Sequence, residues 1–124
     1  MNPNSMDRLR QYIQARFPEG ACTLETTFRQ VPVPMADVCK GAISRAAKEL
    51  GLSQRTLNSG AGHDTMILAE RIPHCGMIFV PSVGGVSHCP QEWTEWEDAN
   101  NGASVLLGAL LELDGKNSSE LEAL

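Results

Sequence analysis

The chain has 124 residues, 42% of them hydrophobic, and its 10 basic and 15 acidic side chains give a formal charge of −5. This length allows one modest domain with a core, and the acidic balance leaves no basic patch for nucleic acid or an anionic membrane surface. No apolar stretch approaches the roughly 20 residues of a spanning helix, and residues 1–5 lack a signal-peptide pattern, so we expect a soluble, cytoplasmic protein.

The first 30 residues predict one helix and one strand. Apolar residues at helical spacing indicate an amphipathic helix that ends near Pro18-Glu19-Gly20. Across residues 22–29, apolar or small side chains alternate with polar ones, as in a strand with one covered face. Because a strand needs partners for its backbone groups, we expect this segment to have a neighbour. The helical positions are Met6, Leu9, Ile13 and Phe17.

Beyond the prolines at 31–34, the pattern predicts alternating helices and a buried strand. A helix is predicted over 35–50, with Gly51 as its left-handed C-cap, and a second one from His63 or Asp64 to Arg71. The apolar run at 77–80 is typical of a fully buried strand, which implies an α/β fold with some parallel pairing. A last helix over 97–113 has its apolar face at Ala99, Ala103, Leu106, Leu107 and Leu110.

The cysteines do not form a metal-binding motif. Cys22, Cys39, Cys75 and Cys89 are far apart in the sequence, and we expect buried or half-buried thiols. The dipeptides at 74–75 and 88–89 each place a histidine beside a cysteine, a combination that zinc sites use. Adjacent residues of an extended chain point to opposite sides, so the geometry argues against a zinc cluster.

Two loops carry candidate functional residues. The loop at 59–64, Ser-Gly-Ala-Gly-His-Asp, precedes a predicted helix, where glycines permit close approach of a ligand and free amides favour an anion. It is also consistent with a plain turn in which Asp64 favours the helix dipole. The loop at 81–92 follows the predicted buried strand, where ligands of α/β sheets gather. There His88 is either a site residue, oriented by Glu92, or a surface histidine.

Together the two loops resemble one enzyme family. SGAGHDTM at 59–66, followed by MIFVPSVGGVSHCPQEW at 77–93, is similar to the C-terminal signature of N-carbamoyl-L-amino-acid hydrolases. Allantoate amidohydrolases and β-ureidopropionases are relatives in the same metallopeptidase-like superfamily. The resemblance extends through the helices predicted on either side. It implies a hydrolase that cleaves linear amide or ureido C–N bonds through a metal-activated water.

The resemblance also implies roles for individual residues. His88 corresponds to a ligand of one of two divalent metals, commonly zinc or manganese, with cobalt or nickel as alternatives, and Glu92 lies in its second shell. Residues of the first loop correspond to the pocket for the substrate carboxylate. Cys89 and Trp93 stand where the family more often has Asn and Tyr. The implied substrate-binding residues are Gly60, Ala61, Gly62 and His63.

Most of the family's active site has no counterpart in these residues. The other metal ligands, the bridging aspartate and the Glu-Glu pair that includes the general base belong to a long N-terminal half, and no Glu-Glu pair occurs here. No catalytic residue is therefore assigned, and we expect a truncated frame that is inactive alone. Residues 1–32 would be a remnant of the lid or dimerisation domain, 33–113 the C-terminal part of an α/β catalytic domain, and 114–124 a polar tail.

Two functional classes follow. In one, the chain is a subunit of a split amidohydrolase, completed by an N-terminal half or by a homo-oligomer, and it binds a small carbamoyl or ureido substrate once complete. In the other, it is a non-catalytic remnant or a structural module that docks on a partner chain. Neither class involves nucleic acid or a membrane.

Overall fold

A computed structural model describes residues 4–27 and 31–115 of the chain. The chain forms two compact units, which divide between Val33 and Pro34. The assignment of residues 1–32 to a lid or dimerisation domain stays a prediction.

The first unit is built on helix α1, Asn4–Arg16, which confirms the predicted helix. The amide of Phe17, the residue after the helix, donates to the carbonyl of Ile13 at 3.0 Å and completes the last turn. Gly20 then has φ +79°, a left-handed conformation that glycine adopts without a Cβ clash. This turn ends the helix where the sequence predicts its end.

The second unit contains helix α2, Asp37–Glu49, within the predicted range 35–50. The Gly51 amide donates to the carbonyl of Lys48, and the Leu52 amide donates to the carbonyl of Ala47. With Gly51 at φ +69°, these two bonds form a Schellman motif. The predicted left-handed residue after the helix is thereby confirmed.

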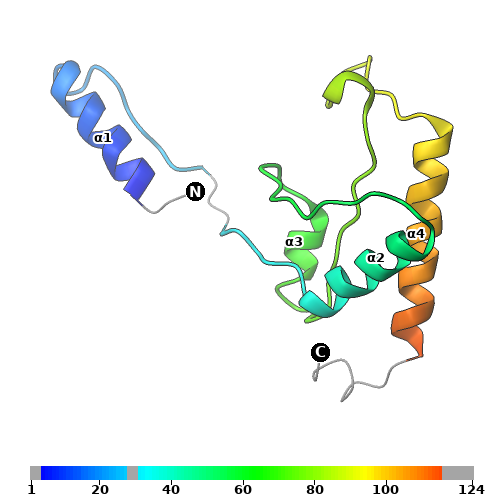
Figure 1. Cartoon of the computed structure of the whole chain (residues 1–124). Helices are drawn as coiled ribbons and strands as arrows, with labels where there is room; N and C mark the ends of the chain where they lie inside the picture. The colour runs from blue at the N-terminus through cyan, green and yellow to red at the C-terminus, as the bar shows by residue number, and fades with distance from the viewer. Residues whose placement is uncertain (1–3, 28–30, 116–124) are drawn as a thin grey trace. The chain divides into compact units, whose positions relative to one another are not determined.

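Helix α4, Trp96–Asp114, packs against α2 and confirms the predicted final helix (Figure 1). The two backbones approach closely at Gly108, where an added Cβ would lie 3.1 Å from the Cβ of Ala46. The Arg45 guanidinium donates to both carboxylate oxygens of Glu112 and bridges the helices. The buried residues that form this core are Ala42, Ala46, Ala47, Val105 and Ala109.

The connection at 75–80 lies along both helices. The Ala36 amide donates to the Cys75 carbonyl at 2.9 Å. An added Cβ on Gly76 would come within 2.7 Å of the Cys39 Cβ, and one on Gly102 of α4 would overlap Val80. Ile78 packs against the α2–α4 core. The segment is thus fixed by one backbone hydrogen bond and by side-chain contacts rather than by a sheet.

The predicted α/β fold is wrong for the described residues, in which all regular elements are helical and no strand occurs. Residues 75–80, which include the predicted buried strand, have no neighbouring strand, and Phe79 and Val80 remain 49% and 40% exposed. Residues 22–27 of the other predicted strand are likewise unpaired, and residues 28–30 lie outside the described part. A strand exists only through hydrogen bonds to another strand. The alternating pattern and the β-prone composition of these segments were therefore not enough to predict a strand.

Two short elements complete the described fold. Helix α3, Asp64–Leu68, has five residues and ends before the predicted Arg71, although the amides of Arg71 and Ile72 both donate to the Leu68 carbonyl. A 3-10 turn, η1, spans Val83–Gly85. Within the part of the chain that the structure covers, no helix is both long and apolar enough to cross a membrane.

The apolar face predicted for the last helix is also wrong. Val105 and Ala109 of α4 are buried against α2, whereas Ala103 is exposed and Leu106, Leu107 and Leu110 are about half exposed. The helix is apolar on both sides, so the sequence alone did not determine which side faces α2. The exposed side extends to Leu111, which is 67% exposed. We call Leu106, Leu107, Leu110 and Leu111 the α4 leucine face.

Candidate functional site

The loop at 59–64 is organised around Ser59 and His63. The Ser59 hydroxyl lies 2.8 Å from Nε2 of His63 and accepts a hydrogen bond from the Ala61 amide at 3.2 Å. Both bonds lie within five residues, so the glycines at 60 and 62 allow the chain to fold back on itself. His63 then starts α3 as its N-cap residue, without a capping side-chain bond.

His63 is also held from outside its loop. Its ring meets the ring of Phe79 edge-on, with centroids 5.4 Å apart and an interplanar angle of 62°. Edge-to-face contacts of this kind stabilise a defined ring orientation. His63 is half-buried, whereas Gly60, Ala61 and Gly62 are exposed. The imidazole is therefore the most constrained group of this loop.

The loop at 81–94 is closed at its base. The Val83 amide donates to the Trp93 carbonyl at 2.8 Å, and the Thr94 hydroxyl donates to the Pro81 carbonyl at 3.0 Å. The Ser82 hydroxyl adds bonds to the carbonyls of Val86 and Trp93. Gly84 and Gly85, at φ +66° and +68°, allow the turn inside this closure. We call residues 81–94 the closed loop.

His88 lies in the closed loop in a rare conformation. Its φ is +58°, the left-handed region that non-glycine residues seldom adopt. The carboxylate of Glu92 accepts a hydrogen bond from the His88 amide at 2.8 Å. The Glu92 amide in turn donates a hydrogen bond to the Cys89 carbonyl at 3.0 Å. Glu92 therefore contacts the backbone of His88 rather than its imidazole. The second-shell role predicted for Glu92 stays a prediction.

Phe79 connects the two loops. Phe79 contacts His63 and is followed two residues later by Pro81, the first residue of the closed loop. No hydrogen bond in the described part joins His63 to His88. Sequence reasoning missed Ser59 as a partner of His63 and Phe79 as its support. The spacing of Ser59 four residues before His63 across two glycines could have indicated the first of these.

The described residues do not contain a complete metal site. Nowhere in residues 4–27 and 31–115 do three or more His, Cys, Asp or Glu side chains converge as a metal site would require. The imidazole of His88 is exposed and can offer one nitrogen ligand. A catalytic zinc site takes three protein ligands, so these residues do not hold a metal on their own.

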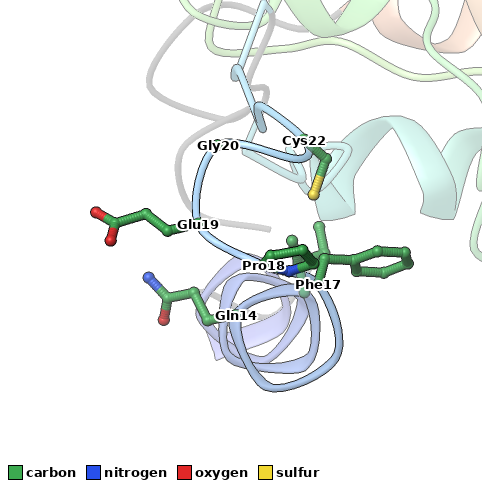
Figure 2. Close-up of a pocket in the computed structure, with 7 residues that line it drawn as sticks. Gln14, Phe17, Pro18, Glu19, Gly20 and Cys22 are labelled. Carbon is green, nitrogen blue, oxygen red and sulfur yellow. The ribbon is translucent and has the colours of Figure 1, made fainter.

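A hollow in the first unit contains no predicted site residue. It lies where the end of α1 meets the turn that follows it, lined by residues such as Phe17, Pro18 and Cys22. Figure 2 shows the Gln14 and Glu19 side chains extending away from Phe17. We assign it no role in the site.

Comparison with known proteins supports the family resemblance that the two loops carry. The sequence profile of peptidase family M20/M25/M40 matches residues 6–112. The chain is 39% identical over 94 residues to an N-carbamoyl-L-amino-acid amidohydrolase of Paenarthrobacter aurescens, covering 76% of this chain and 23% of that protein. An allantoate amidohydrolase of Bacillus subtilis is 41% identical over 90 residues, covering 73% of this chain and 22% of its own length.

A third relative gives the same result. The N-carbamoyl-L-amino acid amidohydrolase of Geobacillus stearothermophilus is 45% identical over 91 residues, which are 73% of this chain and 22% of that enzyme. The chain thus spans less than a quarter of the length of these relatives. No solved structure matches it. The M20 family is metal-dependent, and the match over most of the chain confirms the resemblance: this chain belongs to the peptidase family M20/M25/M40.

Proposed function

We propose that this chain contributes part of the active site of a metal-dependent amidohydrolase that cleaves linear amide or ureido C–N bonds, such as those of N-carbamoyl-L-amino acids or allantoate. The observation that supports this most is the state of His88. The His88 imidazole is exposed, and Glu92 holds the left-handed backbone of His88 in the closed loop. The imidazole can therefore act as a metal ligand. Relatives with these names match over the residues that carry the loop.

In this proposal His88 supplies one ligand of a divalent metal, zinc or manganese, or else cobalt or nickel. The metal, once bound, would supply Lewis-acid activation of water. The remaining ligands and the general base would come from a completing polypeptide, because no group of three or more His, Cys, Asp or Glu side chains converges in residues 4–27 and 31–115. The chain's own contribution is to hold His88 outward from a loop that the Val83 and Thr94 bonds close.

The loop at 59–64 would contact the substrate carboxylate. Gly60, Ala61 and Gly62 leave the backbone accessible, and the His63 imidazole has one nitrogen engaged by Ser59 and the other available. An imidazole N–H bound to a carboxylate is a charge-assisted bond, stronger than a neutral one. This loop would therefore select for an anionic substrate rather than carry out the cleavage.

The completing polypeptide would cover the exposed apolar surfaces of the second unit. The α4 leucine face and Ile67 of α3, 61% exposed, are larger apolar groups than the alanines that dominate the α2–α4 core. Exposed patches of this kind mark interaction surfaces. The partner is an N-terminal half of the same family or a second copy of the chain. The same surfaces favour the alternative in which the chain is a docking module without catalysis.

Complementation separates these functions. The Geobacillus stearothermophilus relative, shortened to lack the segment that matches this chain, is mixed with the chain, with zinc or manganese and an N-carbamoyl-L-amino acid. We expect hydrolysis only when both polypeptides are present, loss of hydrolysis with His88→Ala, and a raised KM with His63→Ala. His74→Ala is the control and should retain activity. A stable complex without any hydrolysis would support the docking module and contradict the proposed function.

A further inference from the structure

The hydrogen bond between Ser59 and His63 gives the substrate loop a defined chemistry. The two side chains lie 2.8 Å apart, from Oγ to Nε2, and the Ala61 amide donates to the same Oγ. A neutral imidazole carries its proton on either Nδ1 or Nε2, and the bond made by one nitrogen decides which. Which group donates between Ser59 and His63 therefore sets what the free nitrogen of His63 can do.

We infer that Ser59 is a positioning residue that donates its hydroxyl proton to Nε2 of His63, so that the neutral imidazole carries its proton on Nδ1 and offers Nδ1–H to an anionic ligand. This rests on the proposed function for the identity of the ligand, the carboxylate of an N-carbamoyl or ureido acid. The tautomer itself rests only on the loop.

The hydrogen-bond capacity of Ser59 supports this direction. A serine hydroxyl has one proton to donate and two lone pairs to accept with. The Ala61 amide already donates to one lone pair, and a hydroxyl that accepts a hydrogen bond becomes a stronger donor. Donation to Nε2 uses the hydroxyl proton within the loop, whereas acceptance from Nε2 would leave that proton to solvent.

Phe79 keeps the imidazole in the orientation that this bond needs. The edge-on contact at 5.4 Å constrains the ring from the side of the connection at 75–80. Rotating the imidazole by half a turn would move Nε2 away from Ser59 and break the hydrogen bond between them. The ring is thus fixed by one polar and one aromatic neighbour, and Nδ1 is the nitrogen without a partner in the described part.

The same pair of atoms could in principle form a serine nucleophile and its base, but the surroundings favour positioning. In nucleophilic triads a carboxylate or equivalent group orients the histidine through its other nitrogen. No carboxylate of the described residues bonds Nδ1 of His63. The Ala61 amide also bonds Oγ directly, which lowers the electron density that a nucleophile needs.

The test is nitrogen NMR of the imidazoles in the 124-residue chain, labelled with ¹⁵N, at a pH where they are neutral. His63→Gln identifies the signals. We expect His63 of the wild-type chain to show a protonated Nδ1 and an unprotonated Nε2. Ser59→Ala should lose that pattern, and Ser59→Thr, which keeps the hydroxyl, should retain it. Ser53→Ala is the matched control, an exposed serine of the same connection, and it should leave His63 unchanged.

A protonated Nε2 in the wild-type chain, or a His63 signal that Ser59→Ala does not alter, would overturn the inference. A second readout uses the complemented enzyme described above. There Ser59→Ala should raise KM about fivefold, the scale of one hydrogen bond, with kcat retained, and Ser59→Thr should restore KM. A loss of kcat at unchanged KM would instead identify Ser59 as a nucleophile and reject the positioning role. The tautomer is measured without substrate or partner, so failed complementation counts against the proposed function alone.

Discussion

The α2–α4 contact can be tested with one pair of substitutions on α4. Val105 is only 6% exposed and packs in the alanine-rich core, whereas Leu111 on the leucine face is 67% exposed. Val105→Ala and Leu111→Ala both shorten an apolar side chain of the same helix. If the core lies where the structure has it, the smaller deletion at Val105 has the larger effect on stability.

The expected sizes follow from the buried surface. Val105→Ala removes two buried methyl groups, about 1.6 kcal/mol at ~0.8 kcal/mol each. An unfilled cavity adds a fraction of this cost, and the better helix propensity of alanine offsets ~0.6 kcal/mol. The net loss of unfolding free energy is about 1.5–2 kcal/mol. Leu111→Ala removes three carbons of which about a third of the surface is covered, so its cost stays below ~0.8 kcal/mol.

Urea unfolding followed by circular dichroism measures both changes, at a concentration where gel filtration gives the monomer. A loss of 1.5–2 kcal/mol corresponds to a Tm lower by roughly 6–16 °C for a unit of this size. An equal or larger loss for Leu111→Ala than for Val105→Ala would refute the assignment of the core face. It would mean that the leucine face packs inside the chain.

Three further results are expected. Glu92→Ala should speed amide hydrogen exchange at His88 several-fold, while Glu92→Gln, which keeps an acceptor, should change it less; equal exchange in all three chains would show that Glu92 does not hold the loop. Burial, and then the charge of Cys75, raise the pKa of the Cys39 thiol above the ordinary 9.0, so iodoacetamide at pH 8 should modify exposed Cys89 before Cys39. The stability that the neutral Cys39 thiol contributes is complete below pH 9 and declines as the pH rises through its raised pKa, and faster labelling of Cys39 would contradict this. The chain alone, with added zinc or manganese, should hydrolyse neither N-carbamoyl amino acids nor allantoate, and metal-dependent turnover abolished by His88→Ala would contradict the need for a completing polypeptide.

The helices were predictable because their signals are local. The apolar stripe and the glycine after it located α2 and its Schellman motif, since both depend on residues within two turns. The strands were not, because pairing depends on residues elsewhere in the chain. The run at 77–80 has the composition of a buried strand, yet without a partner in the described residues it forms part of a connection that meets Cys39 at Gly76 and Gly102 at Val80.

The side of α4 that packs inward was also beyond the sequence. Val105 and Ala109 form one apolar row and the leucine face another, and the larger residues drew the prediction to the wrong row. At the candidate site, both loops were identified from their motifs, but their internal bonds were not. Ser59 to His63 and Glu92 to the His88 backbone depend on turn geometry, which residue types alone do not specify.

The measurement that tests the proposed function most directly is the metal content of the complex between this chain and the shortened Geobacillus stearothermophilus relative. The complex is isolated by gel filtration after loading with zinc, and bound metal is counted by mass spectrometry for the wild type, His88→Ala and His74→Ala. We expect His88→Ala to lower the bound metal and His74→Ala to retain it. Full metal content in His88→Ala, with loss in His74→Ala, would contradict the assignment of His88 as the ligand.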